Sequence, residues 1–290
     1  MFTGSLVAIV TPFRNGKVDE RALGDLIEWQ IRSGTDGIVP CGTTGESATL
    51  SHAEHDRVVA FTVEVAKRRV PVVAGTGSNS TDEAIALTKH AKKAGADGAL
   101  LITPYYNKPT QEGLYRHYKA VAESVDLPLV LYNIPGRTGV NMAASTVARL
   151  MACPTVVAIK EGSGLVQQAS EIIQLCGERI TVLAGDDALT LPMMAVGGKG
   201  VITVTANLVP GDMANMVRAF MAGRLQEAKD LHYRLYPLFT ALFYETNPIP
   251  VKEALQMMGK IDAELRLPLC PMGAENKEKL TRVMKESGLI

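Results

Sequence analysis

The sequence predicts an α/β fold, a (β/α)8 TIM barrel with a C-terminal helical extension. Eight short apolar runs alternate with helix-like segments along the chain. The runs are nearly continuous in Val, Ile, Leu and Ala, as is typical of parallel strands that are covered on both faces. The chain has 290 residues, enough for a barrel of about 250 residues and a further helical region.

The predicted strands follow one another at regular intervals: SLVAIV (5–10), GIVP (37–40), VPVVA (70–74), GALLI (98–102), LPLVLY (127–132), TVVAI (155–159), ITVLA (180–184) and GVITV (200–204). The segment 81–94 illustrates the helices between them, with Thr81 as its expected N-cap and Gly95 as its C-terminal stop. Eight such strand–helix units predict a catalytic barrel over residues 1–224. The helical pattern that continues over residues 225–290 predicts a C-terminal helical region.

Composition excludes several classes of protein. The chain is 47% apolar and 21% charged, which indicates a soluble globular protein. Thirty basic residues balance thirty acidic ones, so we expect no general nucleic-acid or membrane partner. No apolar run reaches the roughly 18 residues of a membrane span, and MFTGSLVAIVTPF has no signal-peptide pattern. The widely spaced cysteines predict free thiols and a cytoplasmic location.

Polar groups gather where the predicted strands end. The ends read TPF (11–13), CGTTGES (41–47), GTGSNS (75–80), TPYYN (103–107), YNIPGR (132–137), KEGSG (160–164), GDD (185–187) and TAN (205–207). The carboxyl ends of barrel strands carry the chemistry of such folds. We therefore expect the active site at this mouth of the barrel.

Lys160 ends the apolar run of VVAIKEGSG (156–164). One interpretation is a strand-end lysine whose ammonium reaches water. A lysine that is desolvated inside a barrel mouth instead has a lowered pKa and becomes an amine nucleophile. Such amines form Schiff bases with carbonyl substrates. We therefore predict metal-free, aldolase-type chemistry at Lys160.

A Schiff-base enzyme must also move protons. Tyr132 ends the strand before Lys160 and is the expected proton carrier, although a packing tyrosine would fit the same position. Thr43 and Thr44 follow the second strand in a glycine-flanked loop, where ordinary turn chemistry is the alternative. Of Tyr105 and Tyr106, at most one is expected to join this chain of hydroxyls.

Arg137 lies in IPGRTG (134–139), after the fifth predicted strand. Its guanidinium is suited to bidentate binding of a substrate carboxylate. A solvated surface arginine is an equally good interpretation of the sequence at this position.

The segments CGTTGES, TPYYNKPTQEGL, YNIPGRTG, VVAIKEGSG and NPIPVK resemble the motifs of the dihydrodipicolinate synthase (4-hydroxy-tetrahydrodipicolinate synthase) family. The resemblance runs from MFTGSLVAIVTP to NPIPVKEAL and the LRLPL that follows, nearly the whole chain. The family belongs to the pyruvate-dependent Schiff-base lyases and aldolases. Sialic-acid lyases and keto-deoxy-sugar aldolases are its relatives, and TPYYNKPTQEGL and the arginine of IPGRTG favour the synthase.

The resemblance implies that Lys160 attacks the keto carbon of pyruvate. Thr43, Tyr132 and Tyr106 would form the proton relay, with Tyr106 reaching across from a neighbouring subunit. Thr44 and the backbone of Ile202 would hold the pyruvate carboxylate. The enamine would then attack L-aspartate 4-semialdehyde.

Further expectations follow from the same resemblance. Arg137 would bind the carboxylate of the semialdehyde at the entrance of the site. The reaction would be the first committed step of the diaminopimelate route to lysine, with no cofactor and no metal. The assembly would be a homotetramer, a dimer of dimers.

The resemblance also implies an allosteric lysine site. The matching residues form a lysine feedback site at the dimer interface in some family members: Ser47, Ala48, His52, His55, Asn79, Glu83 and Tyr105. Capping and solvation of the two histidines are the simpler interpretation, and a zinc pair lacks a third ligand. Two further hypotheses are a metal-dependent lyase that uses Asp186 and Asp187, and a non-catalytic metabolite sensor on the same barrel.

Overall fold

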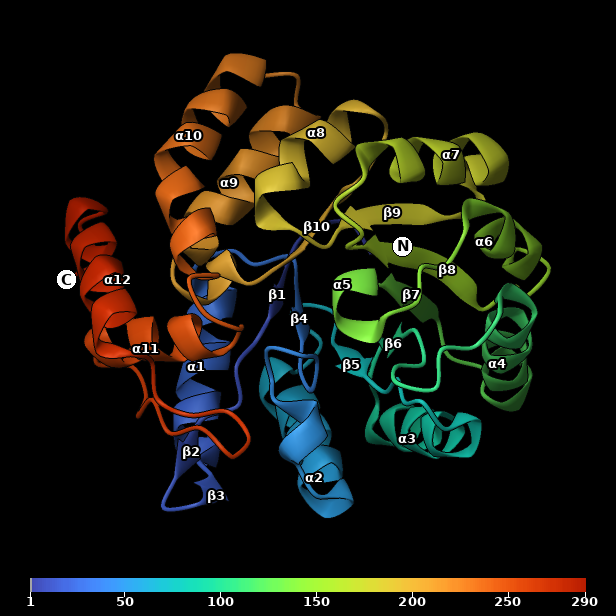
Figure 1. Cartoon of the computed structure of the whole chain (residues 1–290), viewed down its shortest axis with the longest axis horizontal. Coiled ribbons are helices and arrows are strands. Elements are labelled where there is room, and N and C mark those ends of the chain that lie inside the picture. Colours follow the sequence, from blue (N-terminus) through green and yellow to red (C-terminus); the bar gives the residue numbers. More distant parts are fainter. Residues whose placement is uncertain (1) are drawn as a thin grey trace.

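A computed structural model describes residues 2–290. Its centre is an eight-stranded parallel barrel in the spatial order β4-β1-β10-β9-β8-β7-β6-β5, viewed obliquely in Figure 1. The strands are β1 (Gly4–Ala8), β4 (Gly37–Val39), β5 (Val73–Gly75), β6 (Gly98–Ile102), β7 (Leu129–Asn133), β8 (Val156–Glu161), β9 (Thr181–Ala184) and β10 (Gly200–Thr203). A parallel bridge between Ile38 and Val72 joins the two outer members of this order. The predicted TIM-barrel fold is confirmed.

Helices surround the barrel, as Figure 1 shows. They are α1 (Glu20–Arg32), α2 (His52–Ala66), α3 (Thr81–Ala94), α4 (Gln111–Ser124), α5 (Pro135–Thr138), α6 (Ala144–Leu150), α7 (Val166–Cys176), α8 (Thr190–Ala195) and α9 (Pro210–Met221). The C-terminal helices are α10 (Leu225–Ala241), α11 (Ile249–Met257) and α12 (Ala274–Glu286). Short 3-10 turns are η1 (Ser47–Thr49), η2 (Gly177–Arg179), η3 (Asp187–Leu189) and η4 (Thr205–Asn207), and a small hairpin pairs β2 (Phe13–Arg14) with β3 (Lys17–Val18). None of the helices within residues 2–290 has the length and apolar character needed to cross a membrane.

Helix α3 has the predicted bounds, but its first residue has a different role from the one expected. Ser80 is the N-cap residue, and Thr81 is already helical. The Thr81 hydroxyl instead lies 3.0 Å from Nδ1 of His117 on the neighbouring helix. Gly95 ends the helix as predicted, in the left-handed conformation at φ 89° that glycine adopts without strain.

The two faces of the barrel strands form separate apolar cores. One core fills the barrel and includes Val130, Ala158 and Ile202, whereas the other packs the outer faces of the strands against the helices. Side chains alternate between the two faces of a strand. Tyr132 and Lys160 follow Val130 and Ala158 by two residues, so both point into the barrel.

The glycines of GTG (75–77) serve the packing of the barrel. A Cβ on Gly75 would lie 2.1 Å from the carbonyl oxygen of Cys41, and one on Gly77 would lie 2.3 Å from the backbone nitrogen of Ile102. Both positions therefore need a residue without a side chain. These close contacts let the loops after β4 and β5 converge over the barrel mouth.

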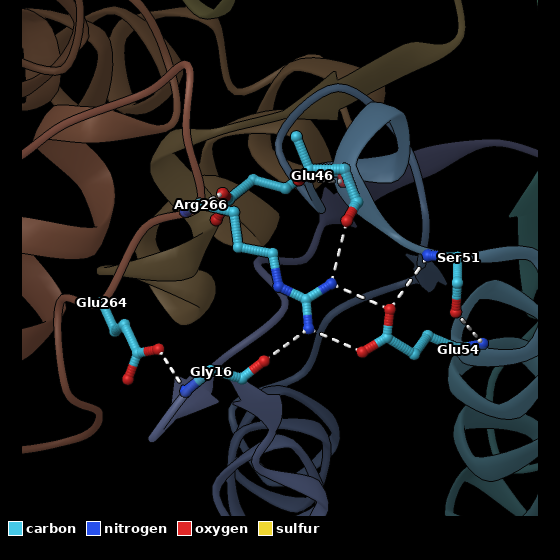
Figure 2. A network of polar contacts seen from close by, with 7 residues as sticks. Gly16, Glu46, Ser51, Glu54, Glu264 and Arg266 are labelled. Carbon is cyan, nitrogen blue, oxygen red and sulfur yellow. Dashed lines mark hydrogen bonds and ion pairs between the residues drawn. The ribbon is translucent and has the colours of Figure 1, made fainter.

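The segment after α11 is attached to the start of α2 through Arg266 (Figure 2). Its guanidinium donates to both carboxylate oxygens of Glu54, at 2.8 and 2.6 Å, and to the carbonyls of Thr49 and Gly16. Hydrogen bonds from Arg266 lower the pKa of Glu54 to about 2. Glu54 also closes a capping box with Ser51, so one arginine joins the C-terminal segment to a helix terminus beside the mouth.

Candidate active site at the mouth of the barrel

Lys160 and Tyr132 lie side by side inside the barrel. They are register partners on β8 and β7, and the Lys160 Nζ lies 4.3 Å from the centroid of the Tyr132 ring. Lys160 is 5% exposed and Tyr132 is 4% exposed. The predicted nucleophile and proton carrier are thus neighbours in a largely desolvated site.

Behind these two residues, the next residue of each strand enters a buried polar network. The Glu161 carboxylate accepts hydrogen bonds from Asn133 Nδ2 at 3.1 Å, Gln168 Nε2 at 3.0 Å and the Ser163 backbone at 2.7 Å. All the donors are N–H groups, and both Glu161 carboxyl oxygens act as acceptors. The network lies on the outer face of the strands and holds together the ends of β7 and β8.

The loop after β4 brings Thr43 and Thr44 to the mouth. Thr44 is buried, and its hydroxyl accepts a hydrogen bond from the Asn247 amide at 3.0 Å. The Asn247 carbonyl in turn accepts from Arg137 at 3.1 Å. Asn247 therefore links the threonine loop to the arginine, and it belongs to the segment before α11.

One cavity of about 460 Å³ opens at this mouth. Thr43, Tyr132, Arg137 and Asn247 line it. Arg137 is exposed, and it lines this cavity. Ile202 lies deeper, in the apolar core that fills the barrel.

The same cavity extends over most residues of the predicted lysine site. Six of the seven line it: Ser47, Ala48, His52, His55, Glu83 and Tyr105. His52 Nε2 lies 2.9 Å from a Glu83 oxygen, whereas the buried His55 donates from Nε2 to the Gly75 carbonyl at 2.8 Å. Burial lowers the pKa of His55. The two histidines thus have separate partners.

Two of the predicted site residues, Asn79 and Tyr106, do not line the cavity. The Asn79 carbonyl accepts a hydrogen bond from Asn107 on the surface. Tyr106 is 89% exposed and has a positive φ of 71°, a conformation that is uncommon for a residue other than glycine. Tyr105 lines the cavity, whereas the Tyr106 side chain is exposed on the surface.

The Asp187 side chain is hydrogen-bonded within the protein. Its buried carboxylate accepts from the backbone of Val204 and from the backbone and hydroxyl of Thr205, at 2.6 to 3.2 Å. Burial raises the pKa of Asp187. Asp186 caps the following turn through Ala188. Within residues 2–290, no three His, Cys, Asp or Glu side chains group as metal ligands would.

Sequence reasoning missed three residues that hold the mouth together: Asn247, Lys252 and Glu161. The first two lie in NPIPVK, where the family resemblance assigns a role to neither of them. Lys252 interrupts an apolar helical stretch, IPVKEAL, and this was the one available signal of its burial. Glu161 offered no signal, because an acid after a strand is ordinary on a surface.

The sequence profile described as the dihydrodipicolinate synthetase family matches residues 1–287. The chain belongs to this family. A 4-hydroxy-tetrahydrodipicolinate synthase of Geotalea uraniireducens is 62% identical over 290 residues, with both chains fully covered. The family resemblance that the sequence motifs indicated is therefore confirmed.

Solved structures of the dihydrodipicolinate synthetase family have the same fold. The dihydrodipicolinate synthase of Aquifex aeolicus is 52% identical, covers 99% of both chains and gives a TM-score of 0.98. A chloride-inhibited enzyme of Acinetobacter baumannii, complexed with pyruvate, is 49% identical with full coverage of both chains and a TM-score of 0.98. The enzyme of Cyanidioschyzon merolae, with lysine bound, is 41% identical, covers 100% of this chain and 99% of its own, and gives a TM-score of 0.97.

Proposed function

We propose that the protein is a 4-hydroxy-tetrahydrodipicolinate synthase, which condenses pyruvate with L-aspartate 4-semialdehyde on Lys160. The observation that carries this proposal is the desolvated Lys160 amine against the Tyr132 ring, inside the barrel of a family member. The reaction is a class I aldolase-type lyase reaction and the first committed step of the diaminopimelate route to lysine.

In the first half of the reaction, the Lys160 amine attacks the keto carbon of pyruvate. The carbinolamine loses water and becomes an imine, and removal of a methyl proton gives the enamine. Tyr132 and Thr43 move the protons, together with Tyr106 from a neighbouring subunit. Thr44 and the Ile202 backbone hold the pyruvate carboxylate.

In the second half, the enamine carbon forms a bond to the aldehyde carbon of the semialdehyde. The aldehyde oxygen takes up a proton and becomes the hydroxyl of the product. The amino group of the semialdehyde then attacks the imine carbon, closes the ring and expels the Lys160 amine. Arg137 holds the carboxylate of the semialdehyde during these steps.

Reductive trapping tests the proposed chemistry. The protein is incubated with pyruvate, reduced with borohydride and mapped by peptide mass spectrometry. We expect a reduced pyruvate adduct on Lys160. Folded protein that stays unmodified with pyruvate in excess would contradict the Schiff-base function, and activity that is lost to a chelator would favour the metal-dependent hypothesis.

Replacing Arg137 by methionine tests the second substrate site. We expect the KM for the semialdehyde to rise about 10- to 100-fold, since a charge-assisted hydrogen bond contributes about 1.5–3 kcal/mol. Pyruvate trapping should be unaffected. Arg149→Met is the matched control, because Arg149 pairs with Glu112 on the outer helices. An unchanged semialdehyde KM in the Arg137 variant would remove this role.

We also propose that L-lysine binds where Ser47, Ala48, His52, His55, Asn79, Glu83 and Tyr105 lie. The support is that six of them line one cavity with Thr43 and Tyr132, and that the Cyanidioschyzon merolae relative holds lysine. Millimolar L-lysine should raise the midpoint of thermal unfolding, and Glu83→Gln should reduce the shift. L-Norleucine, which lacks the side-chain ammonium, is the matched ligand control. An equal response to both ligands would contradict a specific site.

The proposed assembly is a homotetramer, a dimer of dimers, in which Tyr106 enters the neighbouring site. Its support is the 89% exposure of Tyr106. Residues 1–224 would supply the catalytic barrel and residues 225–290 a helical region, in a cytoplasmic enzyme. Sedimentation velocity at assay concentrations measures the assembly, and an active monomer would contradict the shared site.

A further inference from the structure

A buried ion pair joins helix α11 to the loop that carries Thr43 and Thr44. The Lys252 Nζ lies 2.6 Å from a Glu46 carboxylate oxygen. Lys252 is 0% exposed and Glu46 is 4% exposed. The two residues are 206 positions apart in the sequence, so the pair attaches the C-terminal region directly to the barrel mouth.

Lys252 is held from several sides. Its ammonium also donates to the Thr11 carbonyl at 3.0 Å and lies 4.3 Å from the centroid of the Phe13 ring. The Arg266 guanidinium lies at the same distance from that ring. Burial lowers the pKa of Lys252, and the Glu46 charge opposes this shift. The position of the ammonium is therefore set by the carbonyl, the ring and the carboxylate together.

Glu46 lies at the end of the loop that Thr43 and Thr44 belong to. Its backbone N–H donates to the Thr43 carbonyl at 3.1 Å, and its carbonyl accepts from Thr49 at 3.0 Å. It has a left-handed backbone conformation, with φ 53°, which is unfavourable for a residue with a side chain. The Glu46 carboxylate is held by Lys252 on one oxygen and by the Arg266 backbone N–H, at 3.4 Å, on the other.

Two further contacts hold the same loop. The Thr11 hydroxyl donates to the Gly45 carbonyl at 2.7 Å, and Thr11 is also the residue whose carbonyl binds Lys252. Asn247, five residues before Lys252, donates to the Thr44 hydroxyl. A shift of Lys252 would therefore be transmitted through Asn247 to the Thr44 hydroxyl and through Thr11 to the Gly45 carbonyl.

Stability alone is a poor explanation of such a pair. Two charges lose their hydration on burial, and apolar residues of similar volume often stabilise a fold equally well or better. An ion pair does, however, define the positions of two groups more narrowly than apolar packing. Reacting groups need this definition, because a misplacement of about 1 Å can cost 10²-fold in rate.

We propose that Glu46 and Lys252 are positioning residues, whose ion pair sets Thr43 and Thr44 for the pyruvate half-reaction at Lys160. The inference rests on the proposed synthase function. It assigns a catalytic purpose to the junction between the C-terminal helices and the barrel. Neither residue lies among the groups proposed to touch substrate.

The test is the double variant Glu46→Gln/Lys252→Met, which removes both charges and leaves neither one buried alone. We expect it to fold and to show a kcat/KM for pyruvate that is about 100-fold lower. The KM for the semialdehyde should change much less, because Arg137 contacts this loop only indirectly, through Asn247. Borohydride trapping by pyruvate should be slower and remain on Lys160.

Glu46→Asp provides a second variant should the double variant not fold. It keeps both charges and shortens the side chain by one methylene, so the same defect in pyruvate kinetics is expected to a smaller degree. Lys277→Met is the matched control, because Lys277 pairs with Glu253, the neighbour of Lys252 on α11, and does not bind the loop. Its pyruvate kinetics should equal those of the wild type.

A merely structural pair would lower the unfolding midpoint and leave kcat and both KM values of the folded variants intact. That result would overturn the inference while the proposed function stands, provided that the wild-type protein traps pyruvate on Lys160. Wild-type protein that forms no adduct would overturn the proposed function and the inference with it.

Discussion

Replacing Lys160 by methionine is expected to abolish borohydride trapping of pyruvate and to lower kcat/KM by roughly 10³-fold or more. Methionine has a similar length and no amine, so the imine cannot form. The barrel interior should accept it, because removing a desolvated amine leaves no buried charge without a partner. The unfolding midpoint should therefore stay the same or rise, which separates lost chemistry from lost folding.

The matched control for this variant is Lys89→Met. Lys89 is exposed on α3, so its replacement should change neither trapping nor turnover. A pyruvate adduct that persists in the Lys160 variant would show that another lysine is the nucleophile. Turnover that persists without an adduct would exclude a Schiff-base route.

Replacing Tyr132 by phenylalanine is expected to lower kcat by about 10²- to 10⁴-fold, the usual contribution of a general acid or base. The phenyl ring keeps its place beside the Lys160 Nζ atom, so the packing of the barrel changes little. Adduct formation with pyruvate should become slower but still occur on Lys160. Single-turnover trapping and steady-state kinetics together measure both effects.

Tyr118→Phe is a matched control for the loss of a tyrosine hydroxyl. Tyr118 is fully buried on α4, away from the mouth, and its hydroxyl donates to the Leu101 carbonyl at 3.1 Å. Its loss should cost about 0.5–1.5 kcal/mol of stability and leave kcat unchanged. If the Tyr132 variant behaved in the same way, Tyr132 would be a packing residue.

The network around Glu161 explains why Lys160 and Tyr132 are expected to be so sensitive. Each of these two side chains, proposed here as catalytic, precedes a residue of that network on the same strand, and the two strands are in register at both positions. The inner face of the strands thus presents the reacting groups, while the outer face holds the strand ends together. This arrangement limits the freedom of both side chains before substrate binds.

The barrel could be predicted from the sequence because its signals are local. Runs such as GALLI and LPLVLY indicate buried parallel strands, and the period of two along a strand places Lys160 on the same face as Ala158. The end of β8 could also be anticipated, since Lys160 directly follows an apolar run. The boundaries of α3 were predictable for the same reason, although its cap was not, because one residue of shift changes the cap without changing the helical period.

Only the tertiary structure decided how the mouth is held. Glu46 and Lys252 are far apart along the chain, and neither segment by itself indicates which residue its charged side chain will contact. Tyr105 and Tyr106 are adjacent, yet only Tyr105 lines the cavity, because the backbone turns at Tyr106. Local periodicity specifies which face of an element is apolar, whereas the packing of distant elements determines which polar groups meet.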